Sequence, residues 1–172
     1  MILRPAAPAD ARALAQLGHD SFCAAFAHLY RPEDLAAFLQ DVYSEAAVAE
    51  EIADPHIVHR LAADGPGGPL TGFCKLRHPS SYAEYSDAQN PISLGQLYCD
   101  PARTGEGIGA ALMDWAMEEA QDRSCDAIQL SVWSENTRAQ AFYRRHGFAK
   151  IADIDFWVGT HRDDEFLFEV RL

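Results

Sequence analysis

The sequence lacks the features that mark several classes of protein. None of its apolar runs approaches the ~18 residues of a membrane-spanning helix, and Met1–Pro5 shows no signal-peptide pattern. Its four cysteines are scattered without a C-x-x-C pair, and together with the seven histidines they show no zinc-type spacing. We therefore expect buried free thiols, no metal site, no membrane partner and a cytoplasmic location.

Positive charge is also scarce. The 172 residues include 14 lysines and arginines against 26 aspartates and glutamates, which gives a formal net charge of −12. Nucleic-acid-binding proteins are usually basic, so this balance argues against a nucleic-acid partner and against an anionic membrane surface. An acidic field attracts small cations, although acidic residues also serve solubility alone.

The hydrophobic pattern predicts a single domain over residues 1–172, because the length suits one core and no repeat or linker interrupts it. Periodicity and turn residues define its elements. The predicted strands are 3–5, 57–63, 70–76, 92–99, 127–133, 148–158 and 166–172, and the predicted helices are 8–26, one that begins at residue 32, 45–52, 110–123 and 136–145. This order predicts a mixed α/β fold with one open, mostly antiparallel sheet.

The segment Gly105-Glu106-Gly107-Ile108-Gly109-Ala110 is the most informative part of the chain. It joins a predicted strand to the start of a predicted helix. Backbone N–H groups at a helix N-terminus lack partners and carry partial positive charge, and glycines let a phosphate approach without a Cβ in the way. The segment therefore predicts a pyrophosphate site.

A dinucleotide is one ligand that carries such a pyrophosphate. Gly105, Gly107 and Ala110 match G-x-G-x-x-[GA], and Asp126 lies at about the right distance to hold a ribose. That fingerprint usually opens the first βαβ unit of a doubly wound sheet. Here only residues 111–172 follow, and they supply one helix and a hairpin rather than four more βα units, so the pattern argues against a nicotinamide cofactor.

A second signature lies further along the chain. It reads Leu130-Ser-Val132-Trp-Ser-Glu-Asn136-Thr-Arg-Ala139-Gln-Ala-Phe142-Tyr143-Arg-Arg-His-Gly147-Phe148. This stretch, the loop from Leu97 to Gly109 and the opening strand from Ile2 to Ala6 together resemble the GCN5-related N-acetyltransferase (GNAT) family. The resemblance covers nearly the whole chain and is tightest from Leu94 to Phe148.

The resemblance implies an α/β (α+β) domain of about seven strands, with helices on both faces of the sheet and a splay between strands four and five. It implies transfer of the acetyl group of acetyl-CoA to a primary amine of a small molecule by direct attack in a ternary complex. A non-catalytic acetyl-CoA sensor, or acetylation of a protein N-terminus or lysine, stays open. Members of the family often pair through their last strands, which allows a homodimer.

The resemblance also assigns the acetyl-CoA site. The backbone of the strand before the glycine loop would pair with the pantetheine arm, and the loop amides would take the pyrophosphate. The residues so assigned are Leu97, Tyr98, Cys99, Thr104, Gly105, Glu106, Gly107, Ile108, Gly109, Ala110, Asn136 and Tyr143. Asn136 also suits the N-cap of the helix that follows it. Arg138, Arg144 and Arg145 are candidates for the 3′-phosphate of CoA, or simply form a solvated helix face.

The resemblance implies that the Tyr143 hydroxyl lies near the CoA sulfur, and Tyr143 is therefore the expected general acid: a phenol of pKa ~10 stays protonated at neutral pH and can protonate a departing thiolate. Two positions depart from the family pattern. Thr104 stands where Gln or Arg is usual, which removes a cationic clamp on the pyrophosphate, and Ser93 stands where relatives often carry a glutamate base. Covalent catalysis by Cys99 is disfavoured, because no His or Lys is arranged in sequence to activate it.

The general base and the acceptor stay open at this point. Candidates for the base are Glu135, Glu84, His78, Tyr82 and Tyr85. The expected acceptor side combines Phe22, Phe26 and Tyr30 with the loop 82–87, and aromatic rings beside carboxylates suit an organic cation. The segments 28–35 and 164–167 resemble the polyamine-acetylating branch of the family. Amino acids, aminoglycosides and protein N-termini remain alternatives.

Overall fold

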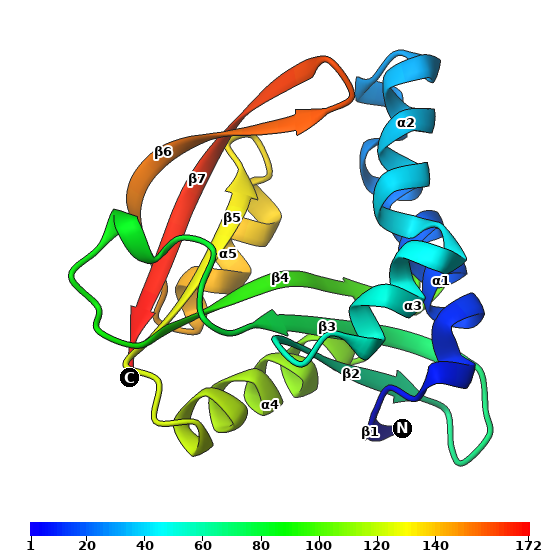
Figure 1. The fold of residues 1–172 in the computed structure, drawn as a ribbon, viewed down its shortest axis with the longest axis horizontal. Helices are drawn as coiled ribbons and strands as arrows, with labels where there is room; N and C mark the ends of the chain where they lie inside the picture. The colour runs from blue at the N-terminus through cyan, green and yellow to red at the C-terminus, as the bar shows by residue number, and fades with distance from the viewer.

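A computed structural model describes residues 1–172 and shows one seven-stranded sheet in the order β1-β2-β3-β4-β5-β7-β6 (Figure 1). The strands are β1 (Ile2–Pro5), β2 (Ile57–Ala63), β3 (Leu70–Arg77), β4 (Pro91–Cys99), β5 (Ala127–Trp133), β6 (Ala149–Val158) and β7 (His161–Arg171). The helices are α1 (Ala11–Phe26), α2 (Pro32–Tyr43), α3 (Glu45–Ala53), α4 (Ile108–Asp122) and α5 (Thr137–Arg145). Only β4 and β5 are parallel neighbours, so the predicted fold class is confirmed.

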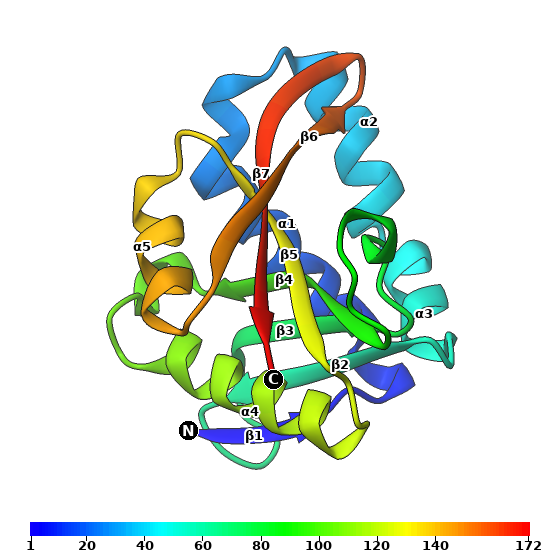
Figure 2. The same cartoon turned by 90° about the vertical axis from the view of Figure 1, so that its left-hand side faces the viewer.

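Helices cover both faces of the sheet (Figures 1 and 2). Successive strand residues point to opposite faces, and β3 shows the consequence. Cys74 packs in the core that contains Leu112 of α4, whereas its neighbour Phe73 packs in the core that contains Leu14 of α1. The side chains of α2 and α3 join the second core, and those of α5 pack against the first. No helix is both long and apolar enough to cross a membrane.

The predicted starts of β7 and α4 are each wrong by two residues or more, and each error has a physical reason. Strand β7 begins at His161 rather than at residue 166, because polar residues 161–165 pair with β6 through the backbone ladder. The alternation of apolar residues in the sequence does not indicate backbone pairing of this kind between polar residues. Helix α4 begins at Ile108 rather than at residue 110, because Gly107, at φ +82°, already ends the loop as its N-cap.

The sheet splits between β4 and β5. Their ladder has three residue pairs, from Pro91–Ala127 to Ser93–Gln129, and then stops. Strand β4 continues along β3, and β5 continues along β7. The register of β4 shifts at Gly95, which is left without a partner opposite β3. Such a bulge bends a strand and increases its twist, so the two halves of the sheet diverge beyond it (Figure 1).

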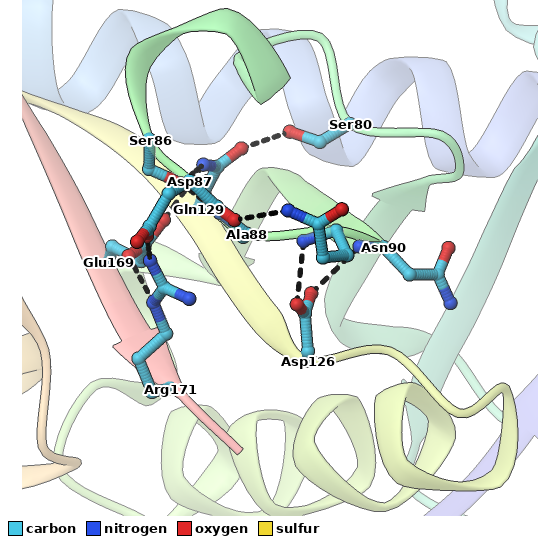
Figure 3. A network of polar contacts seen from close by, with 10 residues as sticks. Ser80, Ser86, Asp87, Ala88, Asn90, Asp126, Gln129, Glu169 and Arg171 are labelled. Carbon is cyan, nitrogen blue, oxygen red and sulfur yellow. Dashed lines mark hydrogen bonds and ion pairs between the residues drawn. The ribbon is translucent and has the colours of Figure 1, made fainter.

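The other end of the split is held shut by a polar network (Figure 3). Gln129 of β5 is fully buried, accepts a hydrogen bond from Ser80 at 2.6 Å and donates one to Glu169 of β7 at 2.8 Å. Asp126 accepts the backbone N–H of Asn90 at 2.9 Å, just before β4. These contacts fix the loop before β4 to β5 and β7, and the split therefore opens in one direction only.

The turn between β6 and β7 reaches across the molecule to α2 (Figure 1). Asp34 of α2 is only 4% exposed and accepts the backbone N–H of Thr160 at 2.8 Å and its hydroxyl at 2.9 Å. Arg31 donates to the same carboxylate at 2.9 Å. These hydrogen bonds, that of Arg31 foremost, lower the pKa of Asp34 to about 2. The carboxylate thus ties the end of the hairpin to the helical layer.

We predict that Asp34→Ala lowers the melting temperature by roughly 5 °C, because it leaves the Thr160 amide and Arg31 without their acceptor. The folded pKa lies below the ordinary value of 3.8. The stabilisation is therefore complete above about pH 4 and is lost as the pH falls toward 2. Calorimetry against pH measures both effects. Glu33→Ala, an exposed carboxylate of the same helix, is the control, and an equal loss in both variants would contradict this role.

Candidate active site

A groove crosses the sheet where β4 and β5 part. Its first section, about 500 Å³, lies between the open edge of β4, the start of α4 and the side of α5. Its narrow middle, about 160 Å³, lies between β4, β5 and β7, and its third section, about 530 Å³, lies under α2. The first and middle sections share Leu97, Tyr98 and Tyr143, and the middle and third share Gly95 and Gln96. The three sections form one continuous path.

The glycine loop presents the amides of α4 to the first section. Gly105 and Gly107 have φ of +89° and +82°, which disfavour any side chain, and a Cβ on either would meet nothing within 4 Å. The space in front of the loop is therefore open to an anion. At the first turn of α4, N–H groups without helical partners and the helix dipole together favour a phosphate there.

The first section brings together the residues that the sequence assigns to the acetyl-CoA site, with one exception. Its lining includes Leu97, Tyr98, Cys99, Thr104, Gly105, Gly107, Ile108, Gly109, Ala110, Asn136 and Tyr143. Glu106 is the exception, because its carboxylate turns to Arg103. Arg138 and Arg145 also line this section, whereas Arg144 lies over the ring of Phe168.

Arg103 is held in ion pairs with Asp64 and Glu106, and we call these three residues the latch. It donates to both oxygens of Asp64 at 3.0 Å, and its Nε donates to Glu106 at 2.8 Å. Hydrogen bonds to these two carboxylates raise its pKa above the ordinary value. The latch joins the glycine loop to the turn between β2 and β3 and neutralises the one acidic side chain of the loop.

The structure gives Cys99 no means of activation. Burial raises the pKa of its thiol, more than a hydrogen bond from the Gly109 amide lowers it. A Cβ on Gly109 would lie 3.7 Å from the Cys99 sulfur, so the thiol packs against the start of α4. A thiol kept protonated is a poor nucleophile, which argues against a covalent acyl-enzyme intermediate.

Comparison with known proteins decides which group the site holds. The model of the acetyltransferase (GNAT) family matches residues 20–148. An N-acetyltransferase of Lactobacillus delbrueckii subsp. lactis is 27% identical over 157 residues, which are 91% of this chain and 88% of that protein. The thialysine N-epsilon-acetyltransferase of Bos taurus is 28% identical over 120 residues, 67% of this chain and 70% of that protein.

Solved structures agree on the fold. The PaiA N-acetyltransferase from Thermoplasma acidophilum, in complex with coenzyme A, superposes with a TM-score of 0.80 at 21% identity, over 99% of this chain and 98% of that one. This chain belongs to the GNAT family. It is an acetyl-CoA-dependent N-acetyltransferase, and the nicotinamide alternative is set aside.

We call the first section the acetyl-CoA section, because it brings together the residues assigned to acetyl-CoA. Tyr143 lies where this section meets the middle section. It extends from α5, and its ring packs edge-on against Phe148 with centroids 5.8 Å apart. Burial, above all, raises the pKa of its phenol well above the ordinary value, and nearby Tyr98 adds to the shift. The hydroxyl is therefore protonated at neutral pH and can donate, as an acid beside the CoA sulfur must.

Asn136 caps its helix, as the sequence predicts, and also lines the groove. Its Oδ1 accepts the N–H of Ala139 at 3.1 Å and so caps α5. The same residue lines the acetyl-CoA and middle sections of the groove. Because the cap uses only the oxygen, its side-chain NH₂ group remains for a ligand.

The acceptor side is partly as predicted. Phe22, Phe26 and Tyr30 line the middle section, as the sequence suggests. From the predicted loop 82–87, Tyr82 lies near this section without lining it: burial raises its pKa, and the charge of Glu165 adds to the shift. Glu84 and Tyr85 are exposed and line none of the three sections.

None of the sequence-proposed bases lines the groove. Glu135 is exposed, and Nε2 of His78 is held by Asn90 at 2.7 Å. The residue that sequence reasoning missed is Glu165 of β7, which lines the middle section. A signal existed: Asp163, Glu165 and Leu167 follow each other at the strand period of two, and all three are buried. Acidic side chains on a buried face are uncommon and indicate a site.

The latch gives a prediction for CoA affinity. Arg103→Ala leaves the Glu106 carboxylate unneutralised beside the pyrophosphate, so we expect CoA to bind about fivefold more weakly, with a smaller effect at high salt. Glu106→Gln removes that charge and is expected to tighten binding by about twofold. Isothermal titration calorimetry measures both dissociation constants.

The control for these two variants is Arg123→Ala, which breaks the Arg123–Glu119 pair at the far end of α4. It is expected to leave CoA affinity unchanged. A weakening of CoA binding by Glu106→Gln equal to that by Arg103→Ala would contradict the electrostatic role of the latch.

Proposed function

We propose that the protein transfers the acetyl group of acetyl-CoA to the primary amine of a small organic cation, by direct attack in a ternary complex. The observation that carries this proposal is the continuous groove with Tyr143 at the junction of its acetyl-CoA and middle sections. A thioester held along β4 and an amine held under α2 would meet at that junction.

In this mechanism the backbone of β4 beyond the bulge holds the pantetheine arm as an added strand. Residues 97–99 have no partner on β5, so their backbone edge is open to such pairing. The glycine-loop amides hold the pyrophosphate, and Arg138 and Arg145, which line the same section, are the candidates for the 3′-phosphate. A backbone N–H of the same β4 edge stabilises the oxyanion, a contribution worth roughly 3 kcal/mol.

Charge and shape favour a small cation as the acceptor. Within the third section, Glu51 is paired with Lys75 at 2.9 Å, whereas Asp41 forms no ion pair. The β6–β7 turn is tied to α2 beside this section. This contact narrows the entrance of the groove and so disfavours an extended peptide as the acceptor. We propose a diamine or polyamine whose reacting nitrogen enters the middle section while a second ammonium lies near Asp41. The bovine relative named for thialysine, itself a small amine, supports this class of acceptor.

A turnover screen tests the activity and its charge preference together. Each amine is mixed with acetyl-CoA, and the released thiol is measured. We expect diamines to show kcat/KM about tenfold above monoamines of equal length, and anionic acceptors to react poorly. Asp41→Asn should remove the diamine advantage and leave the monoamine rate unchanged. Thiol release with no amine tested would favour the sensor alternative.

Tyr143→Phe tests the proposed acid. Without the hydroxyl, the departing thiolate has no donor, so kcat should fall by about 10²-fold while the KM for acetyl-CoA stays within about twofold. Tyr85→Phe, a change at an exposed tyrosine outside the groove, is the control and should leave kcat unchanged. If Tyr143→Phe turned over at the wild-type rate, Tyr143 would be removed from the mechanism.

A further inference from the structure

The groove contains a buried carboxyl without a cationic partner. Glu165 is 8% exposed and lines the middle section together with Tyr143. Its one hydrogen bond comes from the Ser131 hydroxyl at 3.1 Å, and it belongs to none of the ion pairs of the protein. A buried carboxylate is costly unless a charge compensates it, so the site is suited to an arriving ammonium.

The groups that face Glu165 come from every element around it. Asp163 lies on the same strand and Ser131 on β5. Burial raises the pKa values of four nearby tyrosines, and the charge of Glu165 adds to each shift: Tyr30 beyond α1, Tyr82 in the loop before β4, Tyr98 of β4 and Tyr143 of α5. No lysine, arginine or histidine lines this section of the groove. The Ser131 hydroxyl thus orients the carboxyl, and no positive charge in this section neutralises it.

Two other positions at which a carboxylate base would be expected do not supply a free carboxylate. Asp163 is engaged by the Tyr30 hydroxyl at 2.5 Å and by His161 at 3.1 Å. On β4, the position where relatives often carry a glutamate holds Ser93, which is 2% exposed and donates to the Arg77 carbonyl at 3.3 Å. The acceptor cavity therefore depends on β7 for its proton acceptor.

We propose that Glu165 is the general base, and that it takes the proton of the acceptor ammonium before attack. This assignment rests on the acetyl transfer proposed above. The ammonium N–H bond breaks, its proton passes to the Glu165 carboxylate, and the nitrogen lone pair attacks the thioester carbon. As the C–S bond breaks, Tyr143 gives its proton to sulfur, and the second proton lost by nitrogen restores the Tyr143 hydroxyl through solvent. The Glu165 proton then leaves to bulk water.

The protonation equilibrium of Glu165 suits this task. Burial raises its pKa to about 7, helped by the charge of Asp163 and opposed by the Ser131 hydrogen bond. Removing a proton from an alkyl ammonium of pKa ~10 is then unfavourable by a factor of about 10³, against about 10⁶ for an ordinary glutamate. A carboxyl with this pKa is about half ionised at pH 7 and mostly ionised by about pH 8, so it can hold the acceptor ammonium in that range.

The test is the pH dependence of turnover with a primary amine. For the wild-type enzyme, kcat/KM for the amine should fall on the acid side with a midpoint near pH 7, because protonated Glu165 cannot accept a proton. Glu165→Gln keeps the shape and the Ser131 contact. It should lower kcat/KM by about 10²- to 10³-fold, abolish the acid limb and leave the KM for acetyl-CoA within about twofold.

Glu135→Gln, which changes an exposed carboxylate between β5 and α5, is the matched control and should keep the wild-type profile. A wild-type profile without an acid limb between pH 6 and 8 would overturn the assignment, whatever the variant does. So would Glu165→Gln with wild-type kcat/KM and an unchanged limb. Absence of thiol release by the wild-type enzyme would instead overturn the proposed function, and the Glu165 assignment with it.

Discussion

The site depends on how little of β4 is paired with β5. Three residue pairs hold the strands together, and the bulge at Gly95 then turns β4 away with β3 while β5 follows β7. The buried network around Gln129 prevents the split from spreading in the other direction. A complete ladder would leave no backbone edge for a pantetheine arm and no passage from one face of the sheet to the other. The open backbone edge of β4 is thus a consequence of how β4 is paired with β3 and β5.

Charge along the groove changes sign in the order that acetyl transfer needs. The chain as a whole is strongly acidic, yet the acetyl-CoA section is lined by the glycine loop and by Arg103, Arg138 and Arg145, and the carboxylate of Glu106 turns away to Arg103. The acceptor side has Glu165 in its middle section and Asp41 in its third section, neither with a cationic partner. Under the proposed function, an anionic nucleotide and a cationic amine would each be attracted to their own end of the groove, with the neutral thioester between them.

Much of this could be predicted from local sequence. Strands 57–63 and 127–133 match the structure at both ends, because their apolar runs are bounded by turn residues. The glycine loop was predicted from the backbone needs of a phosphate, and Asn136 from its capping preference. These features depend on residues near one another in the chain. The separation of the fourth and fifth strands was predicted from the resemblance to the GNAT family.

The rest depends on contacts between distant segments. Arg103 stands beside the glycine loop in the sequence, but it is paired with Asp64, 39 residues away, and this pairing cannot be seen in the local sequence. Glu165 lines the middle section together with Tyr30, Tyr98 and Tyr143, which come from distant parts of the chain, so the acidic pattern of β7 alone does not show what the carboxyl faces. Its polar neighbours also hid the start of the strand. Tertiary packing decided both cases.

Hydrogen exchange with and without CoA tests the central claim most directly. If the pantetheine arm adds to the open edge of β4, saturating CoA should slow exchange of the backbone amides in residues 97–99, and the glycine-loop amides 105–110 should be protected with them. The β1–β2 pairing, on the far side of the sheet, should exchange at the same rate in both states. Calorimetrically saturated CoA binding that leaves residues 97–99 exchanging as in the free protein would contradict the account.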